Sequence, residues 1–505
     1  MWAATGGHRK VTELFIRRGA DINLVDKFGS NILHLASLGG DVEVMKHVLS
    51  KNMLDINGRV TCGKTAVMMA AENRHKEMVE FLVDQGADVS LVDGTGDNIL
   101  HCACRGGNAE VVKYILLQEK VDINSLGHHQ KTPLMIAGER GHTEVLQLFL
   151  HRACCDGRAD VVKELLLLNL VDINRRGRQR MTSVMLAAKH GHIEVVELLI
   201  KYGADLTLKD EKSNNILHIA SDGGQFDVMK YVLSLNSVNV NIRGRGGRRP
   251  VMIAAEKGYK EMVELLVRHK ANLLLGDRRG DNTLHRACNG GHFDVVKYIL
   301  SLNSVDINSR GWNGRRPVMI AAEKGYQEMV ELLEKHGANL LLSDRRGDNT
   351  LHRACCGGHF DVVKYILSLN SVDINSRGWL RRTPVMEAAE KGHKEVVELL
   401  VKHGADLSLY EKSGRNILHN ACYRGLYDIV KYVLSLKSVD INSRGWKKRT
   451  PVMVAAERGY KKVVELLVKN EANLSLRDED GKNILDLAHK REHLQIVQYV
   501  KSLSI

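Results

Sequence analysis

Residues 317–326 read P-V-M-I-A-A-E-K-G-Y, and this segment decides the fold because it returns at a fixed interval. Near-copies open at Pro250, Pro384 and Pro451, and successive starts lie 67 residues apart (317 minus 250, 384 minus 317 and 451 minus 384). A fixed internal period is typical of one small supersecondary unit stacked many times. The chain is therefore predicted to be an array whose units pack on their neighbours.

Each 67-residue period divides into two halves with the same organisation. Residues 312–344 and 345–378 both contain a short alanine-rich apolar segment, a glycine break and a second segment with helical spacing. In the first half, one stripe of that second segment carries Met329, Val330, Leu332 and Leu333. Every half is thus predicted to fold as helix, tight turn, helix and extended hairpin.

This organisation resembles the ankyrin repeat family. The family's motif is closely matched by K-T-P-L-M-I-A at residues 131–137, and again by A-A-K-H-G-H-I-E-V-V-E-L-L at residues 187–199. The resemblance extends over residues 1–505. It implies an all-α ankyrin-repeat solenoid of about sixteen helix-turn-helix units with β-hairpin fingers. It also implies a concave face, built from hairpin tips and first helices, that holds protein partners.

Seven histidines occupy one repeat position, where the family carries a structural histidine. They are His34, His101, His151, His218, His285, His352 and His419. Ligands one full period apart cannot converge on a single ion. We therefore expect these side chains to hydrogen-bond neighbouring loops, and we expect neither a metal site nor a cofactor.

The period is broken once, between Pro133 and Ser183. These positions are equivalent but lie 50 residues apart (183 minus 133), so seventeen residues are missing from the expected 67. The deletion joins the second helix of one unit to the first helix of the next without glycine or proline between them. We expect one continuous helix of about thirteen residues, ending at Gly157. We also expect the stack to kink or split there.

This break near residues 143–157 is predicted to divide the chain into three segments. The first is an N-terminal array at 1–142 with an incomplete first repeat, and the second is an irregular junction helix at 143–155. The third is a C-terminal array at 156–505 that ends in a polar cap.

The nine cysteines include no C-x-x-C pair. Several recur at one repeat position: Cys104, Cys154, Cys288, Cys355 and Cys422. They are expected to be small buried side chains in a reducing compartment. The longest apolar run, near residues 161–171, contains charged residues and is too short to cross a bilayer. These features predict a cytoplasmic protein without a transmembrane segment, with the nucleus as the alternative location.

Residues 58–65, G-R-V-T-C-G-K-T, match the phosphate-binding pattern G-x-x-x-x-G-K-[ST]. In a nucleotide-binding enzyme that loop follows a buried strand. Here it follows L-D-I-N, the arm of a hairpin, in register with residues 311–317. We therefore interpret it as the repeat's own turn. Metalloprotease, kinase and hydrolase signatures are missing from the sequence, so the chain is not predicted to be an enzyme.

The hairpin tips that lead into the first halves become strongly basic along the chain. From residue 175 onward, none of these tips contains an acidic residue. Recognition residues often lie on loops held by a rigid scaffold. The predicted partner-binding residues are Arg178, Arg245, Arg248, Arg249, Trp312, Arg315, Arg316, Trp379, Arg381, Arg382, Trp446, Lys447 and Arg449.

Three of the four tryptophans share one register position on these tips: Trp312, Trp379 and Trp446. A tryptophan on a turn beside glycine favours contact with a partner. Alternatively, each ring lies flat on its own hairpin, stacked by a neighbouring arginine. Both interpretations stay open at the level of sequence.

Two functions are compatible with the formal net charge of +13. The first is a protein-interaction scaffold, expected to be a monomer, whose partners present acidic or extended segments. The second is binding of RNA, DNA or an anionic membrane through the arginines and tryptophans of the tips. The family resemblance favours the first function.

Overall fold

The computed structural model describes residues 1–51, 53–118 and 120–503. These ranges consist of α-helices, numbered α1 to α31, short 3-10 turns and connecting loops. Their only β-structure is two isolated antiparallel bridges, Arg59–Thr65 and Val92–Asn98. The all-α repeat array is therefore confirmed, whereas the described residues form no strands for the expected β-hairpin fingers. Two compact units are present, Met1–Val228 and Met229–Ile505.

Unit 1 is built from helix pairs. The first helices of the pairs are α1 (Trp2–Thr5), α3 (Ile32–Gly39), α5 (Ala66–Glu72), α7 (Ile99–Gly106), α9 (Pro133–Glu139), α12 (Ser183–His190) and α14 (Ile216–Gly223). The second helices are α2 (Arg9–Arg17), α4 (Val42–Leu49), α6 (Lys76–Asp84), α8 (Ala109–Leu117), α11 (Ala159–Leu167) and α13 (Ile193–Lys201). A longer helix, α10 (Thr143–Asp156), serves both rows, and α15 (Phe226–Ser234) contains the boundary between the units.

Unit 2 repeats the same arrangement. Its first helices are α16 (Pro250–Lys257), α18 (Thr283–Gly290), α20 (Pro317–Lys324), α22 (Thr350–Gly357), α24 (Pro384–Lys391), α26 (Ile417–Arg424), α28 (Pro451–Glu457) and α30 (Ile484–Lys490). Its second helices are α17 (Lys260–Arg268), α19 (Phe293–Ser301), α21 (Gln327–Lys335), α23 (Phe360–Ser368), α25 (Lys394–Lys402), α27 (Tyr427–Ser435), α29 (Lys461–Lys469) and α31 (Leu494–Ser502).

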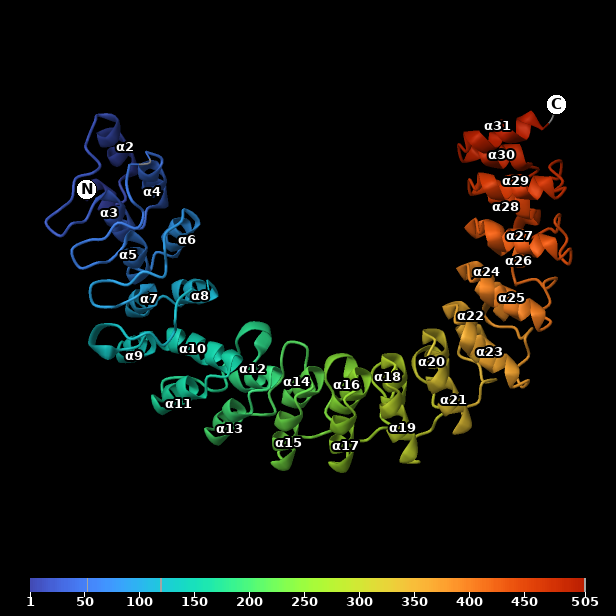
Figure 1. Cartoon of the computed structure of the whole chain (residues 1–505), viewed down its shortest axis with the longest axis horizontal. Coiled ribbons are helices and arrows are strands. Elements are labelled where there is room, and N and C mark those ends of the chain that lie inside the picture. The colour runs from blue at the N-terminus through green and yellow to red at the C-terminus, as the bar shows by residue number, and fades with distance from the viewer. Residues whose placement is uncertain (52, 119, 504–505) are drawn as a thin grey trace. The chain divides into compact units, whose positions relative to one another are not determined.

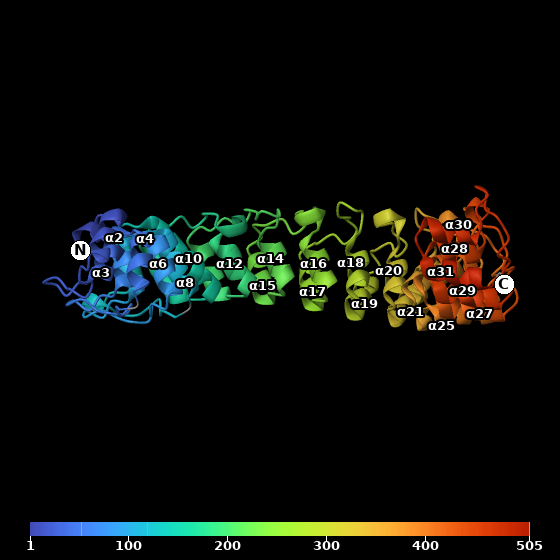
Figure 2. The same ribbon diagram turned by 90° about the horizontal axis from the view of Figure 1, so that it is seen from above.

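Within each unit, the first helices form one row and the second helices another (Figures 1 and 2). α20 shows why the sequence folds this way. Pro317 occupies its first position, where no N–H is needed, and Gly325 ends it with a left-handed φ of 82°. Between them Ala321 and Ala322 are fully buried, so α20 can pack closely on both α18 and α22.

The predicted junction helix is present as α10. It runs without a break over fourteen residues and ends at Gly157, which has a φ of 74°. It packs against α8 and α9, which precede it, and against α11 and α12, which follow it. Phe149 and Leu150 lie where the second helix of one repeat continues into the first helix of the next, and both are fully buried. The continuous helix is confirmed, and the division into separate arrays at this helix stays a prediction.

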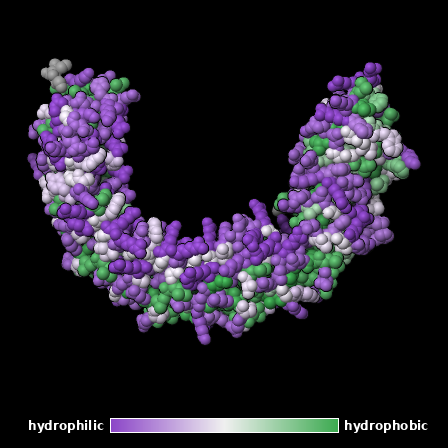
Figure 3. All heavy atoms as spheres, turned by 180° about the vertical axis from the view of Figure 1, so that it is seen from behind, coloured by the Kyte–Doolittle hydropathy of each residue, from purple (hydrophilic) through white to green (hydrophobic). Residues whose placement is uncertain are grey.

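The surface is mainly hydrophilic. On the face shown in Figure 3, hydrophobic residues occur in small groups separated by hydrophilic ones. Among the described residues, none of the helices combines the length and apolar character needed to cross a bilayer.

Candidate functional site

Six loops precede first helices and carry most of the predicted binding residues. We call them the tip loops, and each contains a short 3-10 turn: η1 (His128–Gln130), η2 (Arg178–Arg180), η3 (Arg245–Gly247), η4 (Trp312–Gly314), η5 (Trp379–Arg381) and η6 (Trp446–Lys448). In the loop before α20, Gly311 donates to the Arg315 carbonyl across 2.8 Å and closes the tip. Glycine is required there, because a Cβ would lie 2.3 Å from Asp281 Oδ1.

Hydrogen bonds donated by main-chain amides join the tip loops of unit 2 to the alternate loops between them. The Trp312 amide donates to Asp281 Oδ1 of the preceding loop across 2.7 Å. On the other side, the Arg345 amide of the following loop donates to the Asn313 carbonyl across 2.8 Å. The Trp379 amide repeats the first bond, to Asp348 across 2.8 Å. The loops therefore form a connected ladder, which holds the tips in fixed positions.

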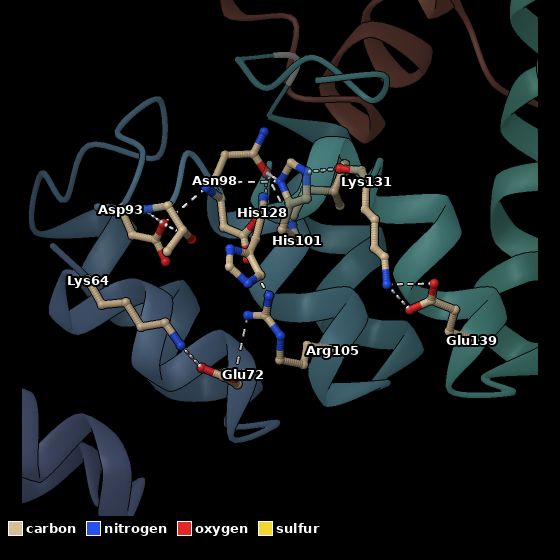
Figure 4. Close-up of polar contacts among 12 residues, drawn as sticks. Lys64, Glu72, Asp93, Asn98, His101, Arg105, His128, Lys131 and Glu139 are labelled. Atoms are coloured by element: carbon tan, nitrogen blue, oxygen red, sulfur yellow. Dashed lines mark hydrogen bonds and ion pairs between the residues drawn. The ribbon is translucent and has the colours of Figure 1, made fainter. Parts of the chain in front are cut away.

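The repeated histidines also hold the loops before first helices in place, through hydrogen bonds from their side chains. His101 lies within 3.1 Å of the Lys131 carbonyl, as the close-up shows (Figure 4). Because a carbonyl oxygen can only accept, Nε2–H must be the donor. The same bond reaches the carbonyls of Gly58, Arg315, Arg382 and Arg449, from His34, His285, His352 and His419 respectively. The predicted structural role is confirmed for these five histidines.

Most of the first helices that follow a tip loop are preceded, two positions earlier, by a lysine or arginine. This side chain forms an ion pair with a glutamate near the C-terminal end of the same helix. The pairs include Lys131–Glu139, Arg248–Glu256, Arg315–Glu323, Arg382–Glu390 and Arg449–Glu457. Lys64 of the apparent phosphate-binding loop makes the equivalent pair with Glu72 (Figure 4). This agrees with its interpretation as an ordinary repeat turn. Much of the predicted basic surface is thus neutralised within the repeat.

Two predicted contact residues are buried. Arg249 and Arg316 are 3% and 2% exposed, and they donate from Nη1 to the carbonyls of Gly276 and Ser343. Burial lowers the pKa of both guanidinium groups. Because the folded chain covers them, we leave these two arginines out of the binding surface.

Arg382 lies among three carboxylates. Its Nε is 2.7 Å from Glu411, and its Nη1 contacts Glu390 and lies 3.6 Å from Glu387. Burial by itself lowers the pKa of Arg382, but Glu411, Glu390 and Glu387 together outweigh burial and leave the pKa raised. Arg382 therefore links the loop, its own helix and the next loop, which is a structural role.

The residues at the ends of the tips remain accessible. Trp312, Trp379 and Trp446 are 44%, 43% and 48% exposed, and Arg178, Arg245 and Arg381 are exposed as well. Lys447 is half-buried, 3.7 Å from Glu479 and 3.9 Å from Asp480.

Each tryptophan ring is accompanied by cations. The guanidinium carbons of Arg279 and Arg315 lie 5.3 and 5.6 Å from the Trp312 ring centroid. Arg346 and Arg382 lie at 5.2 and 5.8 Å from the Trp379 centroid. The arginine stacking expected of a structural tryptophan is thus present, while nearly half of each side chain is still open to a partner.

Sequence reasoning missed one feature of unit 2, a cavity of about 710 Å³ beside Trp446. Tyr423 and Arg458 lie in its lining, on α26 and directly after α28. One signal could have revealed it. Tyr423 stands where the two preceding copies have Cys356 and Asn289, so an aromatic ring replaces a small side chain at this position.

Comparison with known families and proteins agrees with this architecture. A family model described as ankyrin repeats (3 copies) matches residues 1–93, 86–151, 150–243, 234–311, 301–378, 369–445 and 436–504. These overlapping matches cover nearly the whole chain.

Among known proteins, the transient receptor potential cation channel subfamily A member 1 of Homo sapiens is 26% identical, over 94% of this chain and 42% of its own length. The ankyrin repeat and KH domain-containing protein mask-1 of Caenorhabditis elegans is 28% identical, over 90% of this chain and 17% of its own. The B-cell lymphoma 3 protein homolog of Mus musculus is 28% identical, over 52% and 51%. The chain thus spans about half or less of these relatives.

Proposed function

This chain belongs to the ankyrin repeat family, and from that premise we propose that it is a non-catalytic scaffold that binds other proteins through its tip loops and first helices. The ladder of tip loops in unit 2 carries the proposal. The amides of Trp312 and Trp379 donate hydrogen bonds to Asp281 and Asp348, which fixes the two tryptophans one period apart with nearly half of each side chain exposed. Aromatic side chains on a rigid support are common anchors at protein interfaces.

The residues proposed to contact partners are the accessible tip residues of each unit. They are Arg178 in unit 1, and Arg245, Trp312, Trp379, Arg381 and Trp446 in unit 2. The cations paired with glutamates, such as Arg315 and Arg449, hold the loops in place behind this surface.

A partner with an acidic or extended segment fits this surface best. The chain carries a net charge of +13, and exposed arginines recur along the tips. Charge of one sign accelerates encounter with an oppositely charged partner and fixes its orientation. Within unit 2, an extended segment can contact several tips at once because the tips recur at a regular interval.

Polyanion binding is the alternative function, and the exposed arginines are the observation in its favour. Base stacking, however, requires free aromatic faces. Arg279 and Arg315 lie close to the Trp312 ring and compete with a base for it. We therefore rank protein binding first.

Affinity capture with the full chain tests the proposal. R178E/R381E should lose the captured proteins, because it reverses charge only at exposed tip positions. The matched control K297E/K364E makes the same charge change on α19 and α23 and should retain them. If both variants capture the same proteins as the unaltered chain, the tip loops are not the binding surface. Retention on an RNA column that is lost in R178E/R381E would instead favour polyanion binding.

We further propose that the chain acts as a monomer in the cytoplasm, with the nucleus as the alternative. The cysteine pattern supports a reducing compartment, since Cys104, Cys288 and Cys422 are buried repeat residues without disulfides. Light scattering of the purified chain and imaging of a tagged chain test these two points.

A further inference from the structure

The cavity beside Trp446 differs in charge from its counterpart one period earlier. The earlier cavity is about 150 Å³ and its lining includes Asp348, Glu387 and Cys356. At the positions 67 residues later stand Arg415, Val454 and Tyr423, which line the larger cavity of about 710 Å³. Two carboxylates have thus been replaced by a cation and an apolar side chain, and the cavity has become strongly basic.

Several cations of this cavity lack an acidic partner. Glu457 pairs with Arg449 across 2.6 Å and with Arg491 across 3.8 Å, and Asp480 lies 3.9 Å from Lys447. Within the described part of the chain, no acidic side chain pairs with Arg415, Arg458 or Lys490, which also line the cavity.

Two of these unpaired cations gather around one ring. The guanidinium carbons of Arg415 and Arg458 lie 4.9 and 3.8 Å from the Tyr423 ring centroid. The Nε of Arg415 is buried and makes no hydrogen bond. Neither guanidinium is neutralised by an acidic side chain of the described residues, and a bound anion would supply the missing opposite charge. The planar guanidinium groups also match the oxygens of a phosphate in a bidentate manner.

We propose that this cavity binds a phosphorylated side chain on an extended segment of a partner protein. A phosphomonoester carries nearly two negative charges and three acceptor oxygens, which suits two unpaired guanidinium groups better than one carboxylate does. The cavity is also much larger than a phosphate group and can hold flanking residues. This inference rests on the proposed function, because it takes the ligand to be part of a protein partner.

The same geometry disfavours a nucleic acid in the cavity. The guanidinium of Arg458 lies 3.8 Å from the centre of the Tyr423 ring, so a nucleobase cannot stack on that side. Glu457 and Asp480 repel a strand that carries a charge at every nucleotide, whereas a single phosphate can avoid them.

Fluorescence polarisation with the full chain tests the proposal. The probe is a labelled pool of degenerate decapeptides with phosphoserine, phosphothreonine or phosphotyrosine at the centre. Matched pools carry the unphosphorylated residue or glutamate. We expect the phosphorylated pool to bind at least about tenfold more tightly than either, since each charge-assisted hydrogen bond contributes strongly. Inorganic phosphate in large excess should compete with the probe.

R415Q/R458Q should weaken phosphopeptide binding by about tenfold or more. The control R279Q/K324Q removes two positive charges from earlier copies in unit 2, with Lys324 at the position equivalent to Arg458, and should bind normally. Circular dichroism checks folding. If the double variant does not fold, K490Q serves instead, because Lys490 is exposed on the rim.

Equal binding of the three pools, failure of phosphate to compete, or an equal loss in the control variant would overturn the proposal. Tighter binding of a 5′-phosphorylated single-stranded RNA than of the phosphopeptide would overturn it in favour of nucleic acid. Peptide binding is measured directly, and partner capture is tested separately with R178E/R381E. A failure at this cavity is therefore distinguishable from a failure of the scaffold function.

Discussion

Arg315 Nη1 and Glu323 Oε2 are joined across 2.8 Å, from the loop before α20 to the last turn of that helix. The two residues are eight positions apart, and the same pair recurs in most repeats that begin with this type of helix. The arginine that looks like a surface cation in the sequence therefore fastens a loop to the helix beneath it. This relationship changes which substitutions test binding and which test folding.

A double-mutant cycle should show that the Arg315–Glu323 pair contributes to stability. Both side chains are largely buried, at 21% and 28% exposure, so solvent screens the pair only in part. We expect a coupling of about 1 kcal/mol between R315A and E323A in chemical denaturation. Glu328 is exposed on α21, so R315A with E328A should show no coupling. A cycle with zero coupling for the first pair would show that the contact is energetically neutral.

Charge reversal at Arg316 should damage the fold rather than test binding. Arg315, Arg316, Arg381 and Arg382 are all predicted from the sequence to bind a partner, but Arg316 is buried against the Ser343 carbonyl. We expect R316E to cost about 3 kcal/mol, because a buried carboxylate would replace a hydrogen-bonded cation. R316T installs the residue that later copies carry at Thr383 and Thr450, and should leave the melting temperature within a few degrees of its original value. Equal losses for the two variants would contradict this account.

Stability should fall as the solution is acidified from pH 7 toward pH 4. Burial lowers the pKa of His419 from 6.5 to about 4, and it also lowers the pKa of His34, His101, His285 and His352. Below about pH 6.5 the unfolded chain then binds more protons than the folded chain, so acid favours unfolding. The contribution is complete above pH 6.5 and is lost progressively toward pH 4.

Thermal melts at pH 7.5 and pH 5.0 check this dependence. H419M, which installs the residue that the first halves carry at this position, should reduce the difference between the two melting temperatures. An unchanged melting temperature at pH 5.0 would show that these histidines are not buried in neutral form.

The tip tryptophans should contribute more to binding than to folding. Trp312, Trp379 and Trp446 are nearly half exposed, and each cation–π contact at such a site is worth about 0.5–1 kcal/mol. The triple change to alanine should therefore lower the melting temperature only modestly while it abolishes partner capture. If instead the melting temperature falls steeply and capture persists, the rings are structural.

A single residue inserted into α10 should destabilise unit 1 strongly. An alanine between Phe149 and Leu150 rotates the second part of the helix by about 100° relative to the first, since a helix has 3.6 residues per turn. Leu150 and Cys154 would leave their buried positions, at a cost of about 4 kcal/mol. The same insertion between Asn303 and Ser304, in an exposed loop, should be tolerated. Comparable melting curves for the two insertions would mean that α10 does not couple its neighbours.

The array could be predicted from the sequence because its determinants are local. The 67-residue period, the proline and glycine at the ends of α20 and the buried alanines between them all act within one helix or on its nearest neighbour. The junction helix could be predicted for the same reason, since no glycine or proline interrupts residues 143–156. The expected strands of the fingers are not formed by the described residues, and the sequence could not show this, because strand pairing depends on how two loop arms approach each other.

Only the tertiary structure decided which basic residues face the solvent. Arg315, Arg316 and Arg381 have the same charge and lie on equivalent loops, yet one pairs with a glutamate, one is buried and one is exposed. The difference arises because each tip folds back over its own helix and against the next loop, so positions distant in sequence set the surroundings of each guanidinium. The cavity around Tyr423 depends on the same packing: Arg415 and Arg458 come from different repeats, and only the stacking of α26 on α28 brings them to one ring.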